Sequence, residues 1–219
     1  MTREELIKNV ALKMDEISSS DDVIVDVDIS DNNPLYTQIN KLLNESINEA
    51  LVKAPVHRIG NAMMMNGGPY TEKDTTYAGN RTVISIPLPD DFLRLASIDS
   101  GKFQRPIVAL ATDGDEVSNT QRNKFLVAKY AKPVGVLCVD GVSGGKCIKC
   151  YSFDPADNAS VTMTYIPRFN EELGLSVNIK IDAYLSDIVS WICAGKVYSS
   201  RGDTANSKIC DENALALMV

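Results

Sequence analysis

Two cysteines, Cys147 and Cys150, have the spacing in this chain that most directly suggests chemistry. A C-x-x-C pair can supply half of a structural zinc site, or it can act as a redox dithiol. A zinc site needs four ligands, and the other cysteines, Cys138, Cys193 and Cys210, are scattered singletons. A redox pair of the thioredoxin type opens a helix, whereas Cys147 and Cys150 fall within a predicted strand, on opposite faces. We therefore expect buried free thiols.

The remaining candidate groups do not combine into a catalytic set. His57 is the single histidine, and no nucleophile motif stands near it in sequence. Asp90 and Asp91 follow Pro89, where a turn or a helix cap is the simpler interpretation. The segment 142–146 lacks the first glycine of a P-loop and the Ser or Thr after its lysine, so it predicts a hairpin turn. The sequence thus predicts a protein that is not an enzyme and uses no cofactor.

An acidic segment near the N-terminus invites comparison with calcium loops. Asp26 and Asp28 flank Val27, but the segment lacks the glycine turn and the distal glutamate of an EF-hand loop, so no metal is expected. Apolar residues alternate there with mainly polar ones, which predicts a strand or an extended arm with one apolar side. The apolar positions are Val23, Val25, Val27 and Ile29.

Composition restricts the possible partners and compartments. The 219 residues carry a formal net charge of −7 without a basic tail, which disfavours tight binding to nucleic acid. An acidic lining would instead let DNA slide past without adhering. No apolar run approaches the roughly 20 residues that span a bilayer, and the N-terminus lacks an apolar signal region. The five cysteines argue against a fully paired disulfide framework and favour a reducing cytoplasm.

Helical patterns lie at both ends of the chain. Thr2 and Glu5 form a capping box before a helix predicted over residues 3–17, and Asn33-Pro34 begins a stronger helix that ends near Pro55. In the last third, apolar residues at helical spacing predict a helix over about 181–201, with Trp191 packed beside its apolar face. A final helix is predicted over about 205–217.

The middle of the chain is rich in strand patterns. Strands are predicted at 81–86, 92–99, 135–140, 146–153 and 160–166, with a short surface helix within 115–125. We therefore expect an α+β fold, in which N- and C-terminal helices form a helical bundle with an inserted small antiparallel β domain. The expected domains are 1–80 (N-terminal helices and an extended loop), 81–168 (the β-rich insert) and 169–219 (C-terminal helices that complete the bundle).

A long loop is predicted at residues 57–80. It contains three successive methionines, Met63, Met64 and Met65, followed by two glycines, a proline and Tyr70. Thioethers adapt to irregular surfaces, and a loop of more than about 20 residues is uncommon in a compact domain. We expect a contact with a partner here; the alternative is a loop folded against its own domain.

The segment Ile86-Pro-Leu-Pro-Asp-Asp-Phe-Leu-Arg-Leu95 is similar to an LP-D-F-L-R-L phrase of phage adaptor proteins. It is followed by a polar turn at 100–103 and by Arg105-Pro106. The predicted helix at 34–53 resembles the first half of the adaptor helical bundle, and residues 184–217 resemble its last helix and docking segment. Over most of its length the chain resembles the head-to-tail adaptor (connector ring) proteins of short-tailed, crAss-like bacteriophages.

The resemblance implies a structural virion protein of the neck, assembled in the host cytoplasm. Such a protein forms a ring, commonly of about twelve copies, beneath the portal, where it extends the DNA channel and joins capsid to tail. The implied partners are further copies of the chain, the portal protein, adjacent tail or ring proteins, and double-stranded DNA that passes without sequence-specific binding; no membrane is implied. Portal docking would fall on Ala214, Leu215, Leu217, Met218 and Val219. Contacts with neighbours or the next ring would fall on Val25, Val27, Met63, Met64, Met65 and Tyr70.

Three alternatives remain open from the sequence. The chain could be another neck or tail ring protein of the stopper type. It could be a monomeric ligand-binding module on the β insert, although stacking on a ligand needs exposed aromatic residues and the chain has only 6% aromatics, with its one Trp in a predicted helix. A zinc or thiol enzyme that uses Cys147 and Cys150 is the third.

Overall fold

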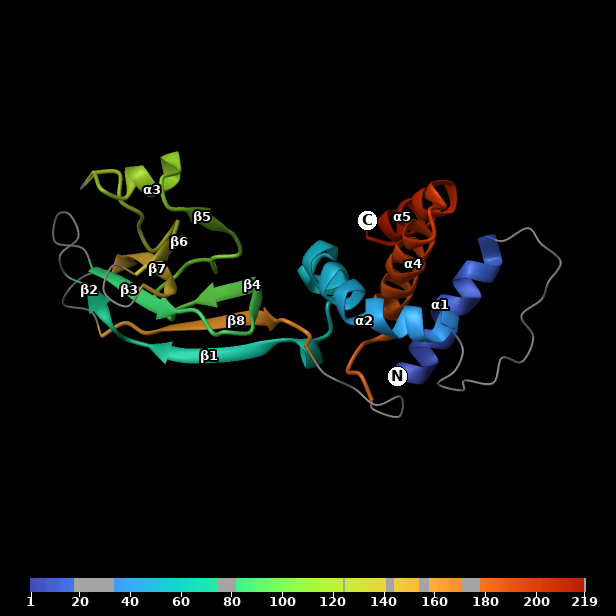
Figure 1. Ribbon diagram of the computed structural model, residues 1–219. Coiled ribbons are helices and arrows are strands. Elements are labelled where there is room, and N and C mark those ends of the chain that lie inside the picture. Colours follow the sequence, from blue (N-terminus) through green and yellow to red (C-terminus); the bar gives the residue numbers. More distant parts are fainter. Residues whose placement is uncertain are drawn as a thin grey trace. The chain divides into compact units, whose positions relative to one another are not determined.

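The computed structural model describes residues 1–17, 34–74, 82–123, 125–140, 144–153, 158–170 and 178–218. The fold is mixed α+β, and the described residues contain five α-helices and two β-sheets (Figure 1). The chain divides into two compact units. We call Met1–Met63 with Arg168–Val219 the helical unit, and Met64–Pro167 the β unit. The expected arm at Val23–Ile29 lies outside the described residues.

The long helices begin where the sequence supplies caps. They are α1 (Arg3–Ile17), α2 (Pro34–Lys53), α4 (Ala183–Ser200) and α5 (Thr204–Leu217). At α1, the backbone N–H of Thr2 donates to Glu5 Oε2 (2.7 Å) and that of Glu5 donates to Thr2 Oγ1 (3.1 Å), so the predicted capping box is confirmed. Asp182 and Asp203 cap α4 and α5 by accepting from backbone N–H groups three residues on.

Helix α4 is the central element of the helical unit, because it packs against α1, α2 and α5. The hydroxyl of Tyr198 on α4 donates to the carbonyl of Met14 on α1 (2.8 Å). The ammonium of Lys196 on α4 pairs with the carboxylates of Glu45 and Glu49 on α2. Side chains are buried on all sides of α4, which explains why its apolar stripe is broad in the sequence.

Trp191 has the packing role that its position in the apolar pattern predicted. Its side chain is only 9% exposed, and the Lys13 ammonium lies 5.1 Å from the ring centroid. This cation–π contact joins α4 to α1. None of the described helices is sufficiently long and apolar to cross a membrane.

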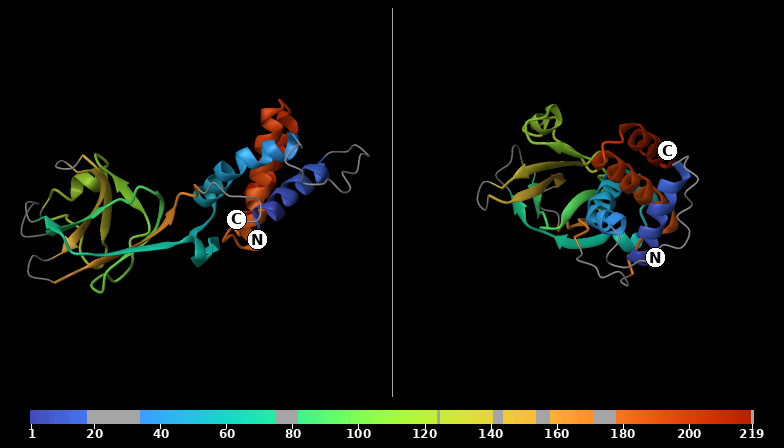
Figure 2. Two further views of the ribbon diagram at one scale, coloured as in Figure 1. Left: turned by 60° about the horizontal axis from the view of Figure 1, so that its bottom comes forward. Right: turned by 45° about the vertical axis from the view of Figure 1, so that its right-hand side comes forward.

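The β unit contains two sheets, which face each other (Figure 2). The three-stranded sheet has the order β1 (Met65–Tyr70), β8 (Val161–Pro167), β4 (Phe92–Asp99). The five-stranded sheet has the order β2 (Lys73–Asp74), β3 (Thr82–Pro87), β7 (Lys146–Phe153), β6 (Val134–Val139), β5 (Leu110–Thr112). The strand pairs are antiparallel, as expected, except that β5 and β6 run parallel. The crossover between these two strands contains α3 (Glu116–Thr120), which is shorter than the predicted helix.

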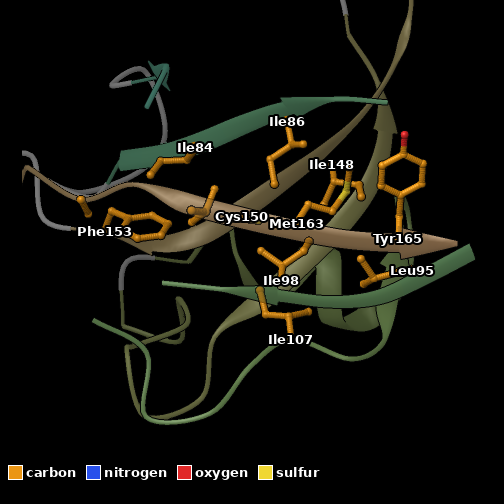
Figure 3. Packing of buried hydrophobic residues seen from close by; sticks show 12 residues of the cluster. Ile84, Ile86, Leu95, Ile98, Ile107, Ile148, Cys150, Phe153, Met163 and Tyr165 are labelled. Carbon is orange, nitrogen blue, oxygen red and sulfur yellow. The ribbon is translucent and has the colours of Figure 1, made fainter. Parts of the chain in front are cut away.

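The core of the β unit lies between the two sheets (Figure 3). Apolar side chains from β3 and β7 meet those from β4 and β8, so strands that are distant in sequence share one interior. Phe153 is fully buried there, with the rings of Phe103 and Tyr130 centred 5.4 and 6.0 Å away. These aromatic contacts hold the loops that contain Phe103 and Tyr130 against the sheet.

The prediction of a continuous loop at 57–80 is wrong for much of that segment. Residues 65–70 form β1, which pairs with β8, and Lys73–Asp74 form β2, which pairs with β3. The β unit therefore begins at Met64, well before the expected boundary at residue 81. The hydrogen bonds that β8 offers outweigh the turn preference of the Gly-Gly-Pro sequence within β1.

Candidate functional site

The C-x-x-C pair does not form a joint site. On β7, Cys147 lies opposite Cys138 of β6, and Cys150 lies opposite Gly135 of β6. Cys147 and Cys150 are three positions apart, so their thiols lie on opposite faces of β7, as predicted. Cys150 is fully buried between the sheets, and this burial raises the pKa of its thiol to about 12. Among the described residues, no group of three or more His, Cys, Asp or Glu side chains is placed to hold a metal ion.

Cys138 is not the isolated cysteine that the sequence suggested. It lies directly opposite Cys147 on the antiparallel pair β6–β7, with 3.4 Å between the two Sγ atoms. The signal for this pair is present in the sequence: Cys138 stands two residues before Asp140, and Cys147 two residues after Gly145, at equal distances from the hairpin turn. The C-x-x-C spacing instead suggested Cys150 as the partner of Cys147.

His57 lies at the surface of the helical unit. It is exposed, in the short 3-10 helix η1 (Val56–Arg58), and among the described residues it has no hydrogen-bond or ion-pair partner. The neighbouring guanidinium of Arg58 stacks over the ring of Tyr184 at 4.6 Å, which attaches this turn to α4. No described side chain activates His57 as a base.

The proline-rich segment 86–95 forms the corner where the chain passes from one sheet to the other. The backbone N–H of Leu88 donates to the carbonyl of Lys146 (3.1 Å), and that of Phe92 donates to the carbonyl of Pro89 (3.0 Å). The strand β3 therefore ends at Pro87, and a tight turn leads into β4.

The acidic pair in this corner has a structural role. The hydroxyl of Tyr165 on β8 donates to Asp91 Oδ1 (3.1 Å), and the Tyr165 ring stacks on Phe92 with centroids 5.9 Å apart. Burial, and next the hydrogen bond to Asp91, raise the pKa of the Tyr165 hydroxyl. Asp90 is exposed. The predicted turn at Asp90 and Asp91 is confirmed, and Asp91 fastens that turn to β8.

The predicted docking residues at the C-terminus differ in exposure. Ala214 is buried inside the helical unit, at 3% exposed, so its side chain is turned away from solvent. Leu215 is 55% exposed, and Leu217 and Met218 are partly buried. Val219 lies outside the described residues.

The predicted neighbour-contact residues are divided between the two units. Met63 ends the 3-10 helix η2 (Asn61–Met63) in the helical unit and is only 9% exposed. Met64 is partly buried, and Met65 on β1 is 51% exposed. Tyr70 packs against the core of the β unit. The three methionines are thus not one continuous apolar patch, and Val25 and Val27 lie outside the described residues.

The net charge of the protein resides in the helical unit. The residues of that unit include eleven basic and eighteen acidic side chains, whereas the β unit has eleven of each. The formal charge of −7 is therefore carried entirely by the helical unit, and the β unit is neutral overall.

Comparisons with known proteins add no family assignment. No protein-family model matches the sequence, and a search of curated proteins found no match. An interpretation of function therefore rests on the residues and on their arrangement.

Proposed function

We propose that the chain is a head-to-tail adaptor of a short-tailed, crAss-like bacteriophage: a structural virion protein that forms a ring beneath the portal. The observation that carries the proposal is the interrupted helical unit. Residues 1–63 and 168–219 fold together, and the β unit is inserted between them, which is the organisation that the resemblance of the sequence implies. In this proposal α1, α2, α4 and α5 are the adaptor bundle, with α4 at its centre.

The exposed apolar side chain of Leu215 supports docking through the end of α5. A half-exposed leucine near a chain end is a suitable anchor, because burying it in a partner stabilises the complex by about 1.5–3 kcal/mol. Ala214 is already buried, so we assign contact to Leu215, Leu217 and Met218 and a packing role to Ala214. Met65 is exposed and Met63 is buried, so we assign contact with a neighbouring copy or the next ring to Met65 rather than to Met63.

The charge distribution is compatible with a DNA channel. An acidic surface repels phosphates, so DNA passes without binding, and the helical unit is the part of the chain with this charge.

The test is the native mass of the purified chain, alone and mixed with the candidate portal protein from the same genome. We expect a discrete ring, formed by the chain alone or only in the presence of portal. The variant Leu215→Ser should weaken portal binding at least about tenfold, because one apolar anchor is lost from each copy. Deletion of 215–219 should abolish binding.

A matched control separates docking from a general loss of apolar surface. Leu12 on α1 is 59% exposed, close to the 55% of Leu215, so Leu12→Ser removes a similar side chain elsewhere on the helical unit. Portal binding should survive this change. A chain that remains a strict monomer with portal present would refute the adaptor proposal, and equal weakening by both variants would refute docking through the end of α5.

A further inference from the structure

Two thiol side chains lie in contact on the neighbouring strands β6 and β7. Cys138 and Cys147 face each other in register, and 3.4 Å separates their Sγ atoms. Cys138 Sγ also lies 3.7 Å from the carbonyl oxygen of Cys147, as a weak donor. All five cysteines are free thiols in this structure.

The backbone geometry suits a covalent bond between these two sulfurs. Residues directly opposite on antiparallel strands have Cα atoms about 4.5–5.5 Å apart, which lies within the range of about 4.4–6.8 Å found in disulfides. Rotation of the two side chains would bring the sulfurs from contact toward bonding distance. Cys150 cannot compete for Cys147, because it lies on the other face of β7 and is buried between the sheets.

The two thiols differ in their access to solvent. Cys138 is partly exposed, so a small reagent reaches its thiol from solvent. Cys147 is only 3% exposed. A small disulfide therefore meets Cys138 first, and Cys147 is held in position to complete the exchange.

We propose that Cys138 and Cys147 are a redox pair that forms an intrachain disulfide across β6–β7 when the chain meets a small-molecule disulfide such as oxidised glutathione. The thiolate of Cys138 attacks one sulfur of the glutathione disulfide, forming a mixed disulfide and releasing one glutathione thiolate. The thiolate of Cys147 then attacks Cys138 Sγ, forming the protein disulfide and releasing the second glutathione thiolate. The two protein thiol protons go to these leaving groups, and the two electrons lost by the protein reduce the oxidant.

The environment of the pair makes the reaction slow at neutral pH. Burial, together with the hydrogen bond and the charge of Cys147, raises the pKa of the Cys138 thiol to about 12. Below this pKa the thiolate fraction, and with it the rate of attack, rises about tenfold for each pH unit. The pair stays reduced in a reducing cytoplasm and oxidises where small disulfides accumulate. This inference does not depend on the ring proposed above.

The experiment uses the full chain, reduced and then incubated with excess oxidised glutathione at about pH 8 and about pH 9. The chain is then unfolded in denaturant so that every remaining free thiol, buried ones included, is blocked before intact-mass analysis. In the unsubstituted chain we expect three of the five cysteines to remain free and be blocked, because two have formed a disulfide. Peptide mapping should show that this disulfide joins Cys138 to Cys147. The initial rate at the higher pH should be about tenfold greater. Retention of all five thiols, a different disulfide, or a stable glutathione adduct on the native chain would each overturn the proposal.

Single substitutions give each thiol its own readout. Cys147→Ser should stop the reaction at a glutathione adduct on Cys138, because the attacking thiol of the second step is absent. Cys138→Ser should leave Cys147 unmodified, because the buried thiol is out of reach of the oxidant. Cys150→Ala is the matched control and should oxidise as the unmodified sequence does. A disulfide that still forms in Cys138→Ser, or one that fails to form in a folded Cys150→Ala, would contradict the assigned pair.

Discussion

The packing of α5 on α4 depends on a glycine, and a larger residue at this position should weaken it. Gly195 is buried in the middle of α4. A Cβ atom added there would lie 3.2 Å from Cys210 Cβ, 3.3 Å from Asp211 Oδ1 and 3.5 Å from the carbonyl oxygen of Ser207, all on α5. The Asp211 carboxylate can rotate away, but Cys210 Cβ is attached directly to the backbone and cannot.

The magnitude follows from two opposing effects. Replacing glycine by alanine within a helix gains about 1 kcal/mol from propensity, whereas overpacking a close contact costs about 1–3 kcal/mol. Gly195→Ala should therefore lower the free energy of unfolding by no more than about 2 kcal/mol. Gly195→Val adds two methyl groups and a branched Cβ in the same space, so we expect a loss of about 2–3 kcal/mol in the free energy of unfolding.

The assay is urea unfolding followed by fluorescence of Trp191, which is the single tryptophan and lies one turn before Gly195 on α4. Ala205→Val, at an exposed position of α5, measures the cost of a branched Cβ in a helix without crowding, which should be about 0.5 kcal/mol. If Gly195→Val is as stable as Gly195→Ala, the close approach of α4 and α5 is wrong, and with it the position of the C-terminal helix.

Two further predictions concern charge and ionisation. Lys196→Ala should lower the free energy of unfolding by about 1 kcal/mol, because Glu45 and Glu49 lose a shared cation that is partly shielded from solvent, and high salt should reduce this difference. The exposed Lys208→Ala is the control, and equal effects of both lysines in urea unfolding would contradict the argument. For Cys150, burial raises the thiol pKa from its ordinary 9.0 to about 12, so the stability due to the neutral thiol is complete below pH 9 and is lost as the pH rises toward 12. Cys150→Ala should be less stable than the unsubstituted chain at pH about 7, because the substitution leaves a cavity. Above pH about 9 the unsubstituted chain should lose about 1.4 kcal/mol more per pH unit than the variant does. Urea unfolding at several pH values measures both curves, and parallel curves would refute the argument.

The helices were predictable because their signals are local. The capping box of Thr2 and Glu5, the proline that starts α2, and the apolar periodicity of α4 each act within a few residues of the element that they define. Strands β3, β4, β6, β7 and β8 were predicted within one residue of their observed ends, since branched residues and turn residues alternate clearly along the chain.

The missed strands depend on partners that are distant in sequence. β1 contains Gly67, Gly68 and Pro69, which favour turns, and only its pairing with β8 makes it a strand. β5 is three residues long and runs parallel to β6 after a crossover, so neither its length nor its neighbour is apparent locally. The exposures of Ala214 and Leu215 are likewise set by the packing of α5, because adjacent helical residues differ in burial according to what lies beside them.

The cysteines show most clearly why spacing alone misleads in a strand. Cys147 and Cys150 are separated by an odd number of positions, and alternation puts such residues on opposite faces, so the apparent motif cannot bring its own sulfurs together. In a hairpin, residues at equal distances from the turn face each other, and counting outward from Asp140 and Gly145 leads to Cys138 and Cys147. The 3.4 Å contact between these two sulfurs is thus a consequence of register, and a shift of the hairpin by one residue would remove it. The glutathione experiment therefore tests the register of β6 and β7 as directly as it tests the redox pair.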